Sequence, residues 1–242
     1  AEKGYSVLVI EKGKKYETKD FPKTNWDLKR WFWLPAFKLF GIQKLSFFRH
    51  ISILSGVGVG GGSLVYANTL PKPKKAFYGH GSWADLADWE TELAPFYDQA
   101  WQMLGAAKNP NLTESDLALK TLAGQIGKTD KFEATKVAVF FGEPGLEVAD
   151  PFFNGEGPDR KGCIHCGACM TGCRHNAKNT LDKNYLYLAQ KLGVDILPEH
   201  VVTDVLSNNE DGSDGYEVVF KKSTEWFSSK KRLNAKGIVF AA

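Results

Sequence analysis

All four cysteines of the chain fall within one short run, which contains Cys163, Cys166, Cys169 and Cys173. The C-x2-C-x2-C-x3-C spacing is that of the bacterial ferredoxins, in which a tight loop wraps thiolates around an iron–sulfur cluster. Arg174 departs from that pattern, because ferredoxins have proline after the last cysteine. We therefore expect an iron–sulfur cluster. Zinc, although zinc sites usually use two separated pairs, or purely structural thiols remain an alternative, and two disulfides remain another.

Basic residues follow the cysteine run directly, at Arg174, His175 and Lys178. Positive charge stabilises a thiolate over a thiol, so we expect lowered pKa values for the neighbouring cysteines. His165 lies inside the run and is a candidate hydrogen-bond donor to a cluster sulfur.

A second cluster of special residues is rich in glycine, with five glycines in the seven positions 56–62. Backbone without side chains lets N–H groups approach a phosphate or a flat ring. Apolar residues on both sides predict a buried turn rather than a flexible linker, and the Gly-Lys-Ser/Thr ending of a P-loop is absent. The residues expected to contact a ligand are Gly58, Gly60, Gly61, Gly62 and Ser63.

An acidic residue, Glu11, ends the apolar segment 6–10. This segment is apolar on both faces, as a central parallel strand is. An acid at the carboxyl end of such a strand is the residue that accepts hydrogen bonds from the ribose of a dinucleotide, although a plain surface acid would look the same.

The remaining pattern predicts alternating helices and strands, hence an α+β fold. Ser82 to Asp85 has the pattern of a capping box that begins a helix, which Pro95 interrupts and restarts. A second capping box, Thr113 to Asp116, begins a helix that Gly127 ends. A further helix is expected over 181–192, and strands over 135–141, 194–197, 201–206, 216–220 and 237–241.

Composition excludes some classes of protein. With 43% hydrophobic and 24% charged residues the chain can form a core, and a net charge of +3 gives no reason to expect nucleic acid as a partner. Ten Lys or Arg against three acids in 12–49 form a basic face, either simply solvated or suited to anionic lipid or a phosphate-bearing cofactor. The aromatic segment 31–54 carries too many charges to span a membrane and predicts a helix or cover. No signal peptide is recognisable, so we expect a cytoplasmic protein.

Three segments together resemble the glucose-methanol-choline (GMC) family of flavoprotein oxidoreductases, and most of all its cholesterol oxidase-like bacterial branch. They are Val-Leu-Val-Ile-Glu-Lys-Gly at 7–13, Gly-Val-Gly-Gly-Gly-Ser-Leu-Val at 58–65 and Gly-Ile-Val-Phe-Ala-Ala at 237–242. Further likeness lies at 135–141, 172–181 and 184–186, so the resemblance covers nearly the whole chain. Tyr66 departs from it, because cholesterol oxidases have asparagine there, and so does the cysteine run.

The resemblance implies FAD, with Glu11 on the adenosine ribose, Gly58 to Ser63 against the pyrophosphate and isoalloxazine, and backbone of Val202 near adenine. It implies a partial Rossmann-like FAD-binding domain over 1–70 and 194–242, around a mainly helical segment, 71–193, that ends in the cysteine-rich loop 163–173. The family's G-x-G-x-x-G would precede Ala1 and its catalytic region would follow Ala242, so we expect a fragment without catalytic residues of its own.

The activity implied is hydride transfer from a hydroxyl-bearing carbon, of a sterol or other lipidic alcohol, to the flavin. Electrons could then leave through the cluster to an acceptor protein. Two alternatives stay open: a dehydrogenase for sugars or other polar alcohols, and a non-catalytic electron-transfer or metal-binding subunit. Partners expected are therefore the alcohol substrate, the missing parts of the same protein and an electron acceptor.

Overall fold

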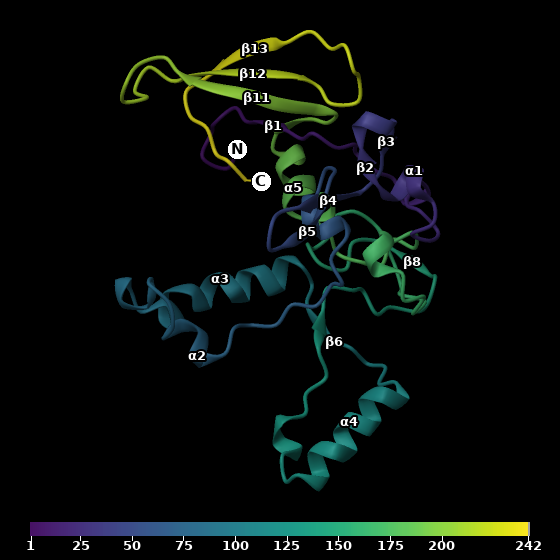
Figure 1. Ribbon diagram of the computed structural model, residues 1–242. Helices are drawn as coiled ribbons and strands as arrows, with labels where there is room; N and C mark the ends of the chain where they lie inside the picture. The colour runs from purple at the N-terminus through teal and green to yellow at the C-terminus, as the bar shows by residue number, and fades with distance from the viewer. Residues whose placement is uncertain (242) are drawn as a thin grey trace.

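A computed structural model describes residues 1–241, which combine helices and short strands as an α+β fold predicts (Figure 1). The expected parallel strand 6–10 is present in part as β1, Leu8–Ile10, which pairs in parallel with β10, Asp195–Leu197. The predicted strand 194–197 is thereby confirmed to within one residue. This pair places the N-terminal segment beside residues 195–197, since Leu8 faces Asp195 and Ile10 faces Leu197 across the ladder. The predicted central position of β1 is wrong for the residues that the structure describes, because β10 is its one partner in a two-stranded sheet and Leu8 is exposed.

A three-stranded antiparallel sheet lies above this pair in Figure 1. Its strands are β11, His200–Ser207, β12, Tyr216–Lys222, and β13, Lys231–Ala235. The central strand β12 carries the buried residues Val218, Val219 and Phe220. The strands predicted over 201–206 and 216–220 are confirmed, with bounds that extend one or two residues further.

The predicted strand 237–241 is wrong. No strand is found there, and the side chains of Val239 and Phe240 are 89% and 78% exposed. The strand that pairs with β12 lies earlier, in the polar segment Lys231–Ala235. This edge strand was missed because Lys231 and Arg232 give it no apolar pattern; hydrogen bonds to β12 define it instead.

The aromatic segment 31–54 forms two hairpins rather than a helix. The short helix α1, Leu28–Trp31, is followed by β2, Trp33–Leu34, paired with β3, Leu39–Phe40, and by β4, Gln43–Phe47, paired with β5, Ser52–Gly56. The expectation of a cover is only partly met, because Phe47, Phe48 and Ile51 at the second hairpin's tip are more than half exposed. Among residues 1–241 no helix is long and apolar enough to cross a bilayer.

Helices α2, Lys75–Tyr78, and α3, Trp89–Met103, project from the body of the molecule in Figure 1. The predicted start at Ser82 is wrong, since α3 begins after Asp88, whose carboxylate accepts the N–H of Thr91. Aspartate is a preferred N-cap residue, and Asp88 is the residue directly before α3. Pro95 lies inside α3 and does not interrupt it.

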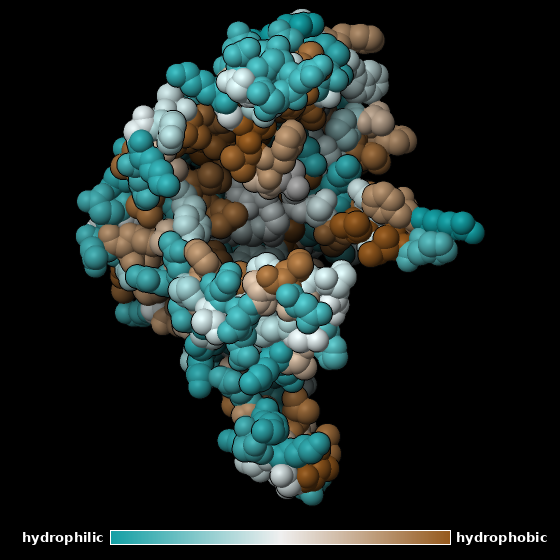
Figure 2. Space-filling model, turned by 90° about the vertical axis from the view of Figure 1, so that its left-hand side faces the viewer, coloured by the Kyte–Doolittle hydropathy of each residue, from teal (hydrophilic) through white to brown (hydrophobic). Residues whose placement is uncertain are grey.

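Helix α4, Glu114–Gln125, forms the end of an arm that extends away from the body in Figure 1. The predicted capping box is confirmed between Thr113 and Asp116, and Gly127 follows the helix with φ of +68°. The base of the arm is the ladder of β6, Ala107–Lys108, with β7, Lys136–Val137, so only two residues of the predicted strand 135–141 are regular strand. Figure 2 shows hydrophobic side chains at the tip of this arm.

The chain between the arm and β10 is mostly loop. It contains β8, Glu147–Val148, paired with β9, Arg160–Lys161, and ends in α5, Tyr185–Lys191. The predicted helix 181–192 is thus shorter, because a separate 3-10 turn, Leu181–Lys183, precedes α5. The core of the molecule contains two clusters of buried hydrophobic residues: Phe21, Ile42, Leu64 and Val65 form one, and Val137, Val139 and Ala177 form the other.

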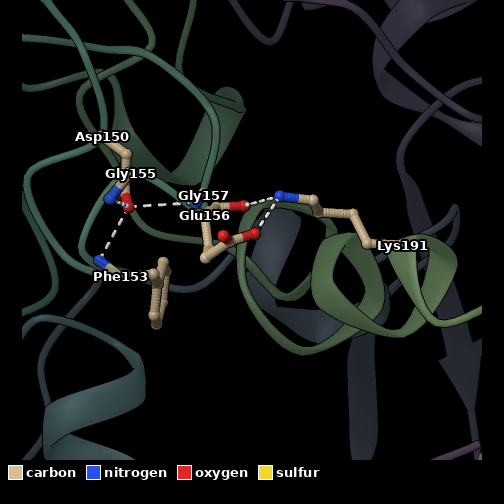
Figure 3. A network of polar contacts seen from close by, with 6 residues as sticks. All are labelled: Asp150, Phe153, Gly155, Glu156, Gly157 and Lys191. Carbon is tan, nitrogen blue, oxygen red and sulfur yellow. Dashed lines mark hydrogen bonds and ion pairs between the residues drawn. The ribbon is translucent and has the colours of Figure 1, made fainter.

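A polar network fixes the loop that leads to the cysteine run (Figure 3). The carboxylate of Asp150 accepts the backbone N–H groups of Phe153, Gly155 and Gly157 at 2.8–3.0 Å. Although partial burial opposes it, these bonds stabilise the charged form and lower the pKa of Asp150. Lys191 of α5 bonds both the backbone carbonyl and the carboxylate of Glu156. The loop is therefore attached to α5.

Candidate functional site

Glu11 and the glycine-rich segment meet directly. We call residues 56–66 the glycine turn, and they include η3, Gly61–Leu64. The Oε1 atom of Glu11 accepts the backbone N–H of Gly13 at 2.7 Å and that of Gly58 at 3.1 Å. The backbone N–H of Glu11 also donates to the Leu197 carbonyl. Glu11 therefore joins the end of β1 to the glycine turn. From the sequence, only the family resemblance implied that these two parts of the chain lie together.

Several glycines are required by the protein's own backbone. A Cβ on Gly13 would lie 2.3 Å from the Gly58 nitrogen, and one on Gly56 would lie 2.4 Å from the Gly61 oxygen. Gly58, with φ of +144°, would press its Cβ to 2.5 Å from the ring of Tyr16. These positions need glycine because two backbone segments, or a backbone and a ring, pass too close for a side chain.

Gly61 and Gly62 differ, because a Cβ on either would meet no atom within 4 Å. Gly61 has φ of +54°, which itself favours glycine, whereas Gly62 has no such backbone requirement. Within residues 1–241 the backbone N–H groups of Gly60 and Gly62 make no hydrogen bond. Open space beside two unused donors is what a ligand with a phosphate or a flat ring would occupy.

The hydroxyl of Ser63 is already used inside the turn. It donates to the Gly60 carbonyl at 2.6 Å and accepts the N–H of Leu181 at 2.9 Å. The contact of Ser63 with a ligand stays a prediction. Its two hydroxyl hydrogen bonds stabilise the conformation of the turn. Tyr66, which replaces the asparagine of the family, donates its hydroxyl to the Asn179 carbonyl at 2.7 Å.

Val202 lies on β11, two residues after His200, whose N–H donates to the Glu11 carbonyl. The register of the β11–β12 ladder shifts between Val202 and Asp204. The predicted contact of Val202 with adenine stays a prediction. Its position does place it on the strand that begins next to Glu11.

The cysteine run does not form a metal site among residues 1–241, where no group of three or more His, Cys, Asp or Glu could hold a metal ion. The iron–sulfur prediction, like zinc, is therefore unsupported. Cys166 is exposed, while Cys163 and Cys173 pack on the cluster of Val137, Val139 and Ala177. All four cysteines are free thiols, so the disulfide alternative is not found either.

The predicted lowering of cysteine pKa values is only partly right. Burial raises the pKa of Cys163 and of Cys169, and for Cys169 it outweighs the attraction of Lys178. The pKa of Cys173 is lowered, because backbone N–H groups, including those of Lys178 and Ala177 at 3.4 Å, stabilise its thiolate against the effect of burial. Backbone donors contribute more to this lowering of the pKa than the nearby Lys183, which acts in the same direction.

Three polar residues near the cysteine run are buried, which the sequence did not indicate. Arg160 and Lys178 are each 1% exposed and Gln43 is also 1% exposed. Arg160 donates to the carbonyls of Asn176, Ala177 and Lys178. Burial lowers the pKa of Arg160 to about 10 and that of Lys178 to about 8. Surface lysine and arginine are the usual expectation, so no sequence signal marks these as buried.

Lys183 gives a prediction for the pH dependence of stability. Burial and the nearby Arg160 lower its pKa to about 8, against the attraction of Asp182. In the unfolded chain the pKa is near its ordinary value of 10.5, so between these values only the unfolded state keeps the proton. The unfolding free energy should therefore rise with pH in this window, by about 2 kcal/mol between pH 7.5 and 9.5.

Urea denaturation at pH 7.5 and 9.5 gives the unfolding free energy of the parent and of Lys183→Met. The contribution of Lys183 is the rise with pH in the difference, parent minus variant. Other groups that titrate contribute to both proteins and largely cancel. A difference that stays constant, or that falls with pH, would contradict the assignment.

Comparison with known proteins places this geometry in context. No protein-family model matches the chain. A cholesterol oxidase of Acinetobacter baumannii is 48% identical over 248 aligned residues, which cover 100% of the chain and 45% of the relative. Over its whole length the chain is similar to part of this cholesterol oxidase. Cholesterol oxidases of two strains of Mycobacterium tuberculosis, CDC 1551 / Oshkosh and H37Rv, are each 44% identical over 248 residues, covering 100% of the chain and 42% of the relative.

The predicted resemblance to the cholesterol oxidase-like branch is confirmed by these relatives. The chain spans less than half the length of each of them. The alignment includes Glu11, the glycine turn and the cysteine run, since it covers the whole chain.

Proposed function

We propose that the chain contributes the FAD-binding site of an oxidoreductase that oxidises the hydroxyl of a sterol. The homology to cholesterol oxidases supports the reaction and the substrate class. The observation that carries the cofactor is the glycine turn, where Gly62 leaves open space and Gly60 and Gly62 have unused N–H donors. These residues fit a flavin nucleotide, because it presents both phosphate acceptors and a flat ring.

The residues of this chain bind and orient. The N–H groups of Gly60 and Gly62 would donate to the cofactor, and Glu11 keeps the turn in place through Gly58. Within residues 1–241 the second carboxylate oxygen of Glu11 accepts no hydrogen bond, so it is available to a ribose hydroxyl. Bound FAD would supply the hydride acceptor for the carbon that bears the hydroxyl. We also propose a Rossmann-like arrangement of 1–70 and 194–242 around it, on the parallel β1–β10 pair.

Figure 2 shows that one face of the molecule is hollowed below the three-stranded sheet, with hydrophobic side chains along part of the rim. Sterols are almost entirely apolar, so they need such a surface near the reacting hydroxyl. We propose that the alcohol substrate approaches the flavin from an apolar surface of this kind. The part of the protein outside this chain would complete the enclosure.

Gly62→Ala tests the cofactor site. A methyl group there meets no protein atom, so the variant should fold at least as stably as the parent, but the methyl would occupy the space of the ligand. We expect the dissociation constant for FAD to rise at least about 30-fold, ~2 kcal/mol. Quenching of flavin fluorescence on titration of flavin-stripped protein measures it, and thermal unfolding checks the fold.

Gly79→Ala is the matched control. Gly79 also has no atom within 4 Å of its Cβ position and no positive φ, but it lies at the end of α2, outside the glycine turn. Its FAD affinity should stay within about twofold of the parent. Unchanged FAD binding by Gly62→Ala would refute the site. Oxidation of cholesterol but not of glucose by the complete protein would support the sterol over the sugar alternative.

A further inference from the structure

We propose that Lys178 is a positioning residue that joins the glycine turn to the cysteine run, so that the flavin-binding site and the cysteines form one mechanical unit. The flavin part of this inference rests on the proposed function. The joint itself does not, because it concerns contacts between two segments of the chain.

The ammonium group of Lys178 makes three hydrogen bonds to backbone carbonyls. Two belong to the end of the glycine turn, Leu64 at 2.8 Å and Tyr66 at 3.2 Å, and the third is Cys169 at 2.7 Å. The Nζ atom also lies 4.9 Å from the centre of the Tyr66 ring. Because Lys178 is 1% exposed, water cannot replace these donors if the side chain is removed.

No carboxylate forms an ion pair with Lys178 among the residues that the structure describes. A fully buried ammonium without a counter-ion is costly, and such a group persists when its donors are all satisfied. Its three hydrogen bonds are accepted by backbone carbonyls of the glycine turn and of the cysteine run. Its position is therefore determined by both segments at once.

A second contact joins the same two segments. The side chain of Gln43 donates to the Met170 carbonyl at 2.7 Å, and Gln43 pairs with Gly56 at the start of the glycine turn. The turn η6, Cys169–Thr171, is thus held at two successive carbonyls, by Lys178 and by Gln43. The sulfur of Cys173 also accepts the backbone N–H of Lys178 at 3.4 Å, which attaches the cysteine run to Lys178 itself.

The connection gives the cysteine run a role that needs no metal. The backbone carbonyl of Cys169, not a cysteine sulfur, is the third acceptor of the Lys178 ammonium group, which holds the end of the glycine turn. A displacement of η6 would remove one of three acceptors of Lys178 and would loosen the carbonyls of Leu64 and Tyr66. The flavin-binding backbone lies immediately before these carbonyls in the sequence, at Gly60 to Ser63.

Lys178→Met tests the joint in the complete protein, prepared without flavin. Hydrogen–deuterium exchange with peptide mass spectrometry follows two peptides, one over 57–66 and one over 166–172. We expect exchange to become at least tenfold faster in both. Arg160→Met is the matched control, because Arg160 is an equally buried cation whose three acceptors all lie in 176–178 and none in the glycine turn. It should leave exchange in 57–66 within twofold of the parent.

Gln43→Met is the second variant, in case Lys178→Met does not fold. It removes the bond to Met170 with little change in volume, and we expect about threefold faster exchange in both peptides. Faster exchange in only one peptide, or equal effects of Lys178→Met and Arg160→Met on 57–66, would overturn the joint.

Titration with FAD then separates this inference from the proposed function. Lys178→Met should raise the FAD dissociation constant at least tenfold more than Arg160→Met does. Coupled exchange with no FAD binding by the parent protein would support the joint and refute the flavin site. FAD binding that is equal in the two variants would refute a positioning role of Lys178.

Discussion

Replacing Glu11 with alanine should weaken FAD binding about a hundredfold, ~2.7 kcal/mol. The carboxylate accepts the N–H groups of Gly13 and Gly58, and such charge-assisted bonds contribute about 1.5–3 kcal/mol each. Without them the glycine turn is no longer held against β1, and the oxygen proposed to accept a ribose hydroxyl is lost as well. Flavin fluorescence titration of the stripped protein measures the change.

Glu11→Gln is the matched control for this prediction. Its amide oxygen can still accept both N–H groups, but without the charge, so we expect an intermediate loss of about tenfold. If glutamine lost as much affinity as alanine, the neutral amide oxygen could not replace the carboxylate, and the charge of Glu11 rather than its hydrogen-bond geometry would account for the loss. If neither changed FAD affinity, the proposed position of the adenosine ribose would be wrong.

Gly162→Ala should have the largest effect on stability, a loss of about 3–5 kcal/mol. A Cβ on Gly162 would lie 1.9 Å from the Glu143 oxygen and 2.7 Å from the Gly142 carbonyl carbon, all of them backbone atoms. The contact cannot be relieved by moving a side chain. Relief requires separating the two segments, which are also joined by the bond from Gly145 N–H to the Gly162 carbonyl.

Chemical denaturation of the parent and the variant gives the loss directly. Gly124→Ala is the control, because Gly124 lies in α4 and a Cβ there would make only an ordinary contact with Thr129. Alanine should stabilise that helix by about 0.5–1 kcal/mol. A Gly162→Ala protein as stable as the parent would show that the close approach of these two segments does not exist in solution.

Features with a strong local signal were predicted well. The parallel strand that ends at Glu11 was predictable because it is apolar on both faces, and the capping box at Thr113 because its chemistry is local. The start of α3 was misplaced since Ser82 and Asp88 both precede a helical pattern, and only the fold decides which caps it. The strand β13 was missed because a polar edge strand is defined by its partner.

The residues of the candidate site were predicted in the same way: local patterns were recognised from the sequence, and contacts between distant segments were not. Glycines that could contact a ligand were visible in the sequence, but the pattern alone does not separate Gly62, with open space, from Gly56, which the backbone needs. The cysteine spacing predicted a cluster because it matches that of cluster-binding loops. Spacing alone does not show whether the four thiols point toward one common site. The iron–sulfur cluster and electron exit through it stay without support among the described residues.

The arm that carries α4 leaves and rejoins the body at one place, where Ala107 faces Val137 across the β6–β7 ladder. A segment whose two ends meet can change in length without moving the strands that hold it. The arm is therefore a module in the evolutionary sense: it can be lengthened, shortened or exchanged among relatives while Glu11, the glycine turn and Lys178 keep their places. Variation in this part of the chain would alter the outer surface of the arm and leave the glycine turn unchanged.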